Sequence, residues 1–183
     1  GTISGAPTQT LTNCAALSGV QAGVDQNRGQ RCASVLLEVP QPHPSITKNA
    51  PSTMQPGDTI TYTLVAANNS DATDVLVDPQ LTDCVPFSSH LVVSNILAGG
   101  SPLPANGWAL EALTPGGCTP TAPNTPNSGT LVQLQYTGAL APGSAAPTIT
   151  YDVTADSFQS PTVLDSPMPP GDYTNTVELT ASD

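Results

Sequence analysis

Proline and glycine occur along the whole length of this chain. Its 183 residues include 20 prolines and 15 glycines, and neither type is confined to one linker. Both residues disfavour a helix interior, proline because it lacks a backbone donor and glycine because it loses much conformational entropy. Between them, apolar and polar residues alternate with the period of two that indicates strands. The sequence therefore predicts short strands and little helix.

Six stretches carry this strand pattern. In one of them Ile60, Tyr62 and Leu64 alternate with threonines, and Pro56-Gly57 just before them is a turn signal. The other predicted strands are Val75 to Val77, Leu91 to Leu97, Leu131 to Tyr136, Pro147 to Val153 and Tyr173 to Leu179. Short strands at this spacing predict an all-β fold, an antiparallel β-sandwich preceded by an N-terminal extended β segment.

A proline-rich run, Val39 to Pro44, is typical of a stiff spacer and divides the chain into residues 1–44 and 45–183. The first part contains a short stretch that is repeated later in the chain. Leu11 to Leu17 is similar to Tyr173 to Leu179, with Thr-Asn at the centre of each. Two interpretations stay open for residues 1–44. They contribute the closing strands of a preceding repeat, or they form a donor or linker segment. The alternative to a repeat is that the two stretches are similar by coincidence in a threonine-rich β protein.

The charge balance excludes several classes of function. Fourteen acidic residues stand against three basic ones, for a net charge of −11, so the chain lacks the basic patches that bind nucleic acid or anionic membranes. No apolar run approaches the ~20 residues of a membrane span, and a signal peptide is not recognisable, which predicts a mature form or an excised piece. With two histidines and no phosphate-binding loop, we expect no enzyme, no cofactor and no metal centre.

The cysteines Cys14, Cys32, Cys84 and Cys118 form no CxxC pair, so a zinc site is not expected. Their even number predicts two disulfides, and Cys14–Cys32 with Cys84–Cys118 is the favoured pairing because each closes a modest loop. Four buried thiols are the alternative. Disulfides predict an extracellular location. The stretch Pro115 to Gly129 is predicted to be a long loop tethered by its cysteine.

Other candidate sites carry weaker signals. Four aspartates between residues 71 and 83 do not match the helix–loop–helix calcium pattern, although a loop site built from backbone oxygens stays open. Asn68-Asn69-Ser70 is a glycosylation sequon. His43 and His90 are predicted to be solvated, and Trp108 is predicted to anchor a loop on the sandwich.

A set of motifs runs through the second part of the chain. They are Ile46-Thr47-Lys48, Pro56 to Leu64, Ala67 to Ser70, Val75 to Pro79, Gly138 to Gly143, Ile149 to Val153 and Thr174-Asn175-Thr176. In these motifs the chain from Ser45 onward resembles the conserved-repeat domain that occurs in tandem in large bacterial surface proteins. The resemblance implies an immunoglobulin-like stalk or fibre module. It also implies that Asn13 lies in the closing strand of a previous module.

Some domains of this kind carry a self-formed Lys–Asn isopeptide bond beside an acidic residue. The resemblance assigns these roles to Lys48, the only lysine, and Asn175, with Asp78 as the assisting acid. Asp83 is the reserve, because the strand register around Val75 to Val77 slips by one from the usual pattern of the family. Strand alternation places Lys48 on the same face as Ile46. A buried amine tends to be the neutral nucleophile, and a buried carboxyl can shuttle protons. The alternatives are that Lys48 is an exposed surface lysine, that Asn175 is a buried amide bonded to backbone, and that Asp78 is a turn residue.

Together these features predict an extracellular, cell-surface structural module with neighbouring repeats or identical subunits as partners. Its only reaction would be a single self-crosslinking event. The first alternative is a filament subunit that donates its N-terminal strand to the next molecule, with Asn13 as the candidate residue for strand exchange. The second is an adhesin head that binds a protein or glycan. The predicted loops contain few aromatic residues and almost no arginine. Because these residues usually dominate binding hot spots, the sequence disfavours the adhesin alternative.

Overall fold

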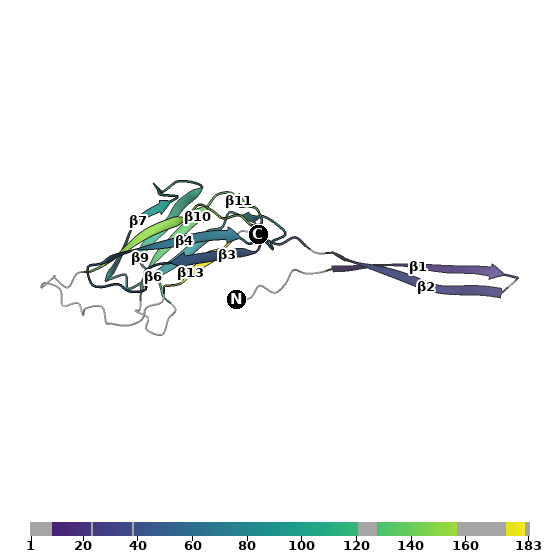
Figure 1. Cartoon of the computed structure of the whole chain (residues 1–183). Helices are drawn as coiled ribbons and strands as arrows, with labels where there is room; N and C mark the ends of the chain where they lie inside the picture. Colours follow the sequence, from purple (N-terminus) through teal and green to yellow (C-terminus); the bar gives the residue numbers. More distant parts are fainter. Residues whose placement is uncertain (1–8, 23, 38, 121–127, 157–174, 182–183) are drawn as a thin grey trace. The chain divides into compact units, whose positions relative to one another are not determined.

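The structure is a computed structural model that describes residues 9–22, 24–37, 39–120, 128–156 and 175–181 (Figure 1). The described chain is built from antiparallel strands, as the sequence predicts, and it divides into two compact units, Gly1–Gln41 and Pro42–Asp183. No helix of the described residues is long and apolar enough to cross a membrane.

The first unit is a β-hairpin of β1 (Gln9–Gln21) and β2 (Val24–Leu37). Cys14 lies directly opposite Cys32 in the ladder, and the two form a disulfide, called here the hairpin disulfide. Two strands alone are marginally stable in water, so a covalent tie across them holds their register. The sequence predicted the first of these strands but not the second, in which polar residues predominate from Asp25 to Arg31.

The second unit is a sandwich of two antiparallel sheets. One sheet has the order β3 (Pro44–Asn49), β4 (Thr59–Asn68), β12 (Ile149–Ala155), β7 (Leu91–Ala98) and β8 (Ser101–Pro102). The other has the order β13 (Val177–Thr180), β6 (Gln80–Pro86), β10 (Gly129–Tyr136) and β9 (Trp108–Cys118). A short pair, β5 (Leu76–Val77) with β11 (Ala139–Leu140), completes the unit. The predicted antiparallel sandwich is therefore confirmed.

The core follows from the alternation of apolar residues along the strands. Each sheet contributes its inward positions, which are buried, such as Leu64 and Ile149 from one sheet and Leu81 and Val132 from the other. Outward positions are mostly polar, because threonines occupy them on β4 and β12. Burial of these apolar side chains is the main stabilising term, at about 25 cal/mol per Å² of apolar surface.

Two predictions about loops are wrong. Trp108 is the first residue of β9 and is 1% exposed, with its indole nitrogen donating to the Pro147 oxygen at 2.8 Å, so it belongs to the core. Pro115 to Cys118 continue β9 instead of starting a long loop, because Cys118 pairs with Gly129 in the ladder to β10. Residues 121–127 of that predicted loop, and Tyr173 and Thr174 of the last predicted strand, lie outside the described residues.

The first and last strands of the sandwich lie next to each other and meet the surface at the same end (Figure 1). At the start of β3, Pro44 pairs with Asn68, whose amide donates to the Leu140 oxygen. At the end of β13, Thr180 lines a pocket with Asp78. The backbone nitrogen of Asp78 donates to the Gly138 oxygen, two residues from Leu140, so this pocket lies at the same end. Chain enters and leaves the sandwich at this end.

Candidate functional site

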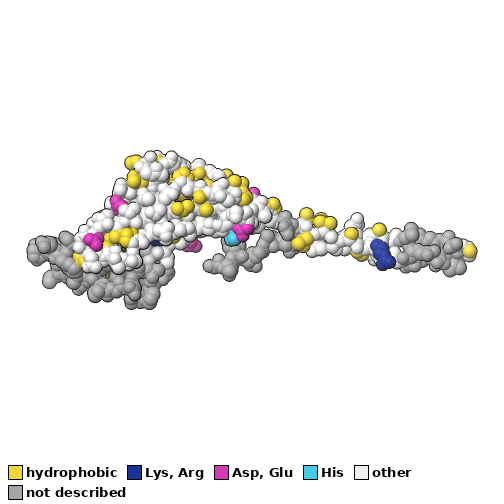
Figure 2. All heavy atoms as spheres, in the orientation of Figure 1, with side chains coloured by type: hydrophobic (Ala, Val, Ile, Leu, Met, Phe, Trp, Pro, Cys, Tyr) yellow, Lys and Arg dark blue, Asp and Glu magenta, His cyan; other side chains and the backbone are white. Residues whose placement is uncertain are grey.

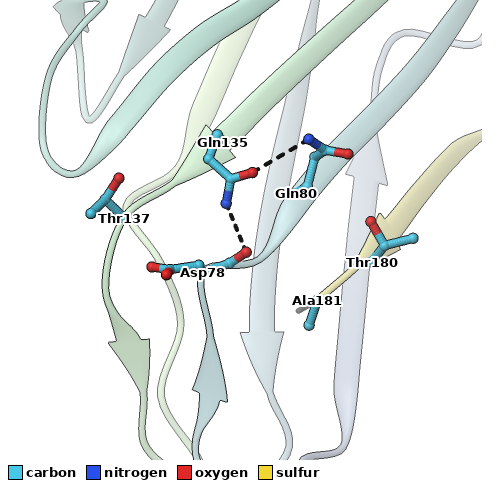
Figure 3. A pocket seen from close by; sticks show the side chains of 6 residues that line it. All are labelled: Asp78, Gln80, Gln135, Thr137, Thr180 and Ala181. Carbon is cyan, nitrogen blue, oxygen red and sulfur yellow. Dashed lines mark hydrogen bonds between the residues drawn. The ribbon is translucent and has the colours of Figure 1, made fainter. Parts of the chain in front are cut away.

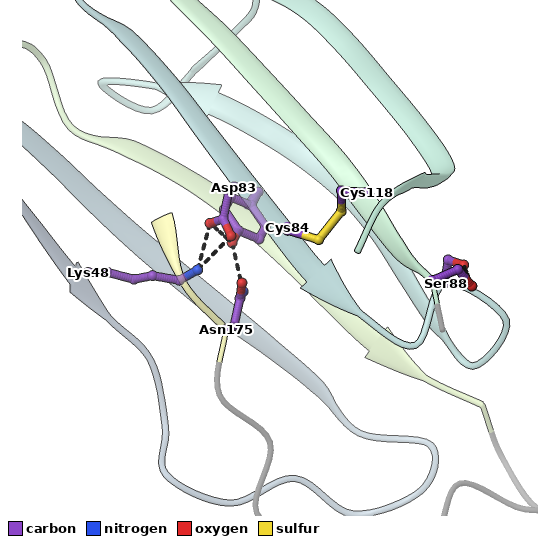
Figure 4. The surroundings of a disulfide bond; sticks show 8 residues. Lys48, Asp83, Cys84, Ser88, Cys118 and Asn175 are labelled. Carbon is purple, nitrogen blue, oxygen red and sulfur yellow. Dashed lines mark hydrogen bonds and ion pairs between the residues drawn. A yellow bond between two sulfur atoms is a disulfide. The ribbon is translucent and has the colours of Figure 1, made fainter. Parts of the chain in front are cut away.

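An ion pair joins the two sheets inside the sandwich. The Lys48 amine on β3 donates to both carboxylate oxygens of Asp83 on β6, at 2.8 and 2.6 Å (Figure 4). The Lys48 side chain is 12% exposed and the Asp83 side chain 1%. A pair so far from water is retained only where its hydrogen bonds are satisfied, because the desolvation of both charges is costly.

Strand alternation turns both side chains inward. Lys48 follows the partly buried Ile46 by two residues, as the sequence predicts. Asp83 lies between Leu81 and Val85, which are each 1% exposed, so it occupies a core position of β6. The carboxylate therefore faces the opposite sheet and meets the only lysine of the chain.

Two stacked tyrosines form one wall of the site. Tyr62 on β4 and Tyr151 on β12 are directly paired, with their ring centroids 5.2 Å apart. The Lys48 amine lies 4.9 Å from the centroid of the Tyr62 ring, a cation–π distance. The Tyr151 hydroxyl donates to Oδ2 of Asp83 at 2.6 Å. Charge and aromatic surface thus meet in one buried cluster.

Asn175, just before β13, completes this cluster. Its amide nitrogen donates to the Tyr151 hydroxyl at 3.4 Å. Its buried oxygen Oδ1 has no hydrogen-bond partner within the part of the chain that the structure describes. A buried acceptor without a hydrogen bond costs about 1–3 kcal/mol.

Burial governs the proton affinities of the site. Removal from water lowers the pKa of the Lys48 amine, although the charge of Asp83 and its hydrogen bond partly offset this effect. Burial also raises the pKa of the Tyr151 hydroxyl, with the Asp83 charge adding to the rise. Burial raises the pKa of the Tyr62 hydroxyl as well. Burial therefore makes the Lys48 amine easier to deprotonate and disfavours ionisation of both hydroxyls.

Asp78 lies elsewhere. It follows β5 with a positive φ of 43°, and its carboxylate accepts a hydrogen bond from the Gly138 backbone at 2.8 Å. It lines an open pocket whose other members are Gln80, Gln135, Thr137, Thr180 and Ala181 (Figure 3). Of the two aspartates that the sequence offers as the assisting acid, the structure brings only Asp83 to Lys48.

Both disulfides have the pairing that the sequence favours. Besides the hairpin disulfide, Cys84 on β6 joins Cys118 on β9, called here the sandwich disulfide (Figure 4). Gly129 lies beside it, since a Cβ at that residue would be 2.8 Å from the Cys84 sulfur. Two disulfides fit a secreted or extracellular protein.

The remaining candidate sites gain little support. Asn68 of the sequon is fully buried and donates to two backbone oxygens, so it is not a surface acceptor for a glycan. His43 is half exposed and bonds Asp71 at 2.7 Å. The described residues contain no group of three or more side chains suited to hold a metal ion. Asn13 lies in the hairpin, opposite Ala33.

No family model matches the sequence, and no similar protein is found among curated ones. The resemblance to conserved-repeat domains accordingly stays a prediction that depends on the motif residues alone.

Sequence reasoning missed both tyrosines of the site. Tyr151 occupies the centre of the alternating run Ile149, Tyr151, Val153, so its inward orientation is readable from the sequence. Its proximity to Asp83 is not, because that contact depends on how the two sheets pack.

Proposed function

We propose that this chain is a structural module of an extracellular stalk or fibre, an immunoglobulin-like sandwich closed by an isopeptide bond between Lys48 and Asn175. Asp83 is the assisting acid in this proposal. The observation that carries it is the buried lysine–aspartate pair beside an asparagine whose carbonyl oxygen has no partner among the described residues. The protein performs no turnover on other molecules and needs no cofactor.

The chemistry requires only these side chains. Proton transfer from the Lys48 amine to Asp83 along the 2.6 Å contact yields a neutral amine and a neutral acid. The amine nitrogen then attacks Cγ of Asn175, a new C–N bond forms, and the bond from Cγ to Nδ2 breaks with loss of ammonia. Burial lowers the pKa of the Lys48 amine and so lowers the cost of this proton transfer.

The arrangement of the first and last strands gives the bond a mechanical purpose. Tension on the two ends of the sandwich would peel β3 and β13 from their neighbours, starting where both meet the surface. Lys48 lies four residues into the sandwich from Pro44, and Asn175 lies five residues before Thr180. A bond between them stops the peeling after these short segments, and the 126 residues between them carry no tension.

Force spectroscopy on the full chain tests this function. Held by its two ends under reducing conditions, the Asn175→Ala variant should extend further on unfolding than the wild type. At about 3.4 Å per residue, the released segment adds about 430 Å. Equal extension of the two chains would overturn the proposal, because the wild type would then hold no bond between these strands.

The hairpin favours a second candidate function, assembly by strand addition. On one of its faces Leu11, Val35 and Leu37 are 53%, 62% and 43% exposed, and Figure 2 shows hydrophobic side chains along its described part. Asn13 shares this face with Leu11 by strand alternation. An apolar two-stranded sheet is suited to complete the sandwich of a neighbouring copy or repeat.

Sedimentation of the full chain over a range of concentrations tests this second candidate. Strand addition predicts assembly that a Leu11→Asn/Val35→Asn double variant abolishes, whereas Thr12→Asn on the opposite face leaves it intact. A wild-type chain that stays monomeric at every concentration would count against it.

A further inference from the structure

The hydroxyl of Tyr151 lies between the acid and the amide of the proposed crosslink. It donates to Oδ2 of Asp83 at 2.6 Å and accepts from Nδ2 of Asn175 at 3.4 Å. The same Oδ2 accepts from the Lys48 amine at 2.6 Å. These contacts form one continuous chain of hydrogen bonds from the attacking nitrogen to the leaving nitrogen.

We propose that Tyr151 is a catalytic residue of crosslink formation, and that its hydroxyl relays the proton from Asp83 to the departing nitrogen of Asn175. This inference rests on the proposed Lys48–Asn175 bond and assigns the route by which ammonia leaves. The contacts of the described residues connect Asp83 to Nδ2 through the Tyr151 oxygen.

The relay balances every proton. After the neutral amine attacks Cγ, the Lys48 nitrogen carries one proton too many, and Nδ2 needs one to depart as ammonia. Once Asp83 is protonated and Cγ is tetrahedral, Nδ2 has a free lone pair, and the Tyr151 hydroxyl turns to accept from Asp83 and donate to Nδ2. Asp83 then takes the proton from the Lys48 nitrogen and passes its own to the Tyr151 oxygen, which gives its original proton to Nδ2. The new C–N bond forms, the old one breaks, Tyr151 ends with one proton as it began, and Asp83 remains the neutral acid that it was when the amine attacked.

The environment of Tyr151 suits a relay better than a general acid that ionises. The side chain is fully buried, and the nearby Asp83 carboxylate disfavours a phenolate. Burial and this charge hold the pKa of the hydroxyl far above its ordinary value, so it gives up a proton only as it receives another. The stack on Tyr62 and the packing of β12 hold the ring at its place between the sheets.

Kinetics of crosslink formation test this role. The full chain is made by cell-free synthesis under oxidising conditions, sampled over time into denaturant, fully reduced, and weighed by mass spectrometry for the loss of about 17 Da that ammonia accounts for. Tyr151→Phe retains the stacked ring and should slow the loss about 100-fold or more. Tyr136→Phe, the same change in a tyrosine packed on Trp108, is the matched control and should react at the wild-type rate.

A wild-type rate in Tyr151→Phe would overturn the relay and leave the crosslink standing. A wild type without the mass loss would overturn the crosslink, and the relay with it. Where Tyr151→Phe does not fold, the wild-type rate in mixtures of H2O and D2O decides. Several protons moving in the rate-limiting step predict a curved dependence on the deuterium fraction, and a linear dependence or none contradicts the relay.

Discussion

Replacement of Asp83 by asparagine separates the buried ion pair from the proposed crosslink. The substitution keeps the shape of the side chain but removes the charge opposite Lys48, whose side chain is 12% exposed. Removal of one partner from a buried pair costs about 3–5 kcal/mol. In an Asn175→Ala background, where no crosslink can form, this is the whole predicted loss in the free energy of unfolding.

In the otherwise unaltered chain the same substitution also prevents the crosslink. A bond from Lys48 to Asn175 closes a loop of 175 − 48 = 127 residues, and the loop-entropy relation assigns such a closure about 4.9 kcal/mol. Asp83→Asn should therefore cost roughly 8–10 kcal/mol in this background, about 5 kcal/mol more than in the Asn175→Ala background.

Guanidinium unfolding followed by fluorescence measures both losses, because Trp108 is the only tryptophan and lies in the core of the sandwich. Asp152→Asn is the matched control. That aspartate bonds Thr61 and Asn95 on the outer face, and its replacement should change the stability by no more than about 0.5 kcal/mol. Equal losses for Asp83→Asn in the two backgrounds would refute the coupling between Asp83 and a crosslink.

Three further predictions concern stability. Replacing both cysteines of the sandwich disulfide by alanine should lower the unfolding free energy probed by Trp108 by about 3.8 kcal/mol, from its closed loop of 34 residues, whereas the same change in the hairpin disulfide should leave that transition unmoved. Gly129→Ala should cost about 1–3 kcal/mol in the same assay, because its Cβ would meet the Cys84 sulfur and a backbone oxygen, both at 2.8 Å. Burial raises the pKa of Tyr62 and Tyr151, so above about pH 10 the unfolded chain loses protons that the folded protein keeps. Denaturant midpoints should therefore fall as the pH rises through that range, and a rising midpoint would contradict the burial of these hydroxyls.

The fold is largely readable from local patterns. Alternation predicted the strands that contain Leu64, Val93 and Val153, because buried residues alternate in each with more exposed ones. It missed β2 and β6, in which polar residues are frequent, and the whole of β9, in which a proline and two glycines precede Cys118. Those strands are held by partners across the ladder more than by their own composition.

The site is readable only in part. Lys48 and Ile46 share a face by alternation, so the inward lysine follows from the sequence. The choice between Asp78 and Asp83 depends on the register, and the short β5 ends at Val77, just before the left-handed residue Asp78, after which a new strand begins. Leu81, Asp83 and Val85 alternate as a core strand does, which marks Asp83 as the inward acid. The meeting of Asp83 with residues of the other sheet depends on tertiary packing, which no local pattern encodes.

The intact mass of the purified, fully reduced chain shows whether the Lys48–Asn175 bond forms. A crosslinked chain has a mass about 17 Da below that of the sequence, from the loss of one ammonia, and we expect the full mass of their own sequences for Lys48→Met and for Asn175→Ala. A wild-type chain with the full sequence mass would contradict the crosslink, since Lys48 and Asp83 would then form a buried ion pair and nothing more.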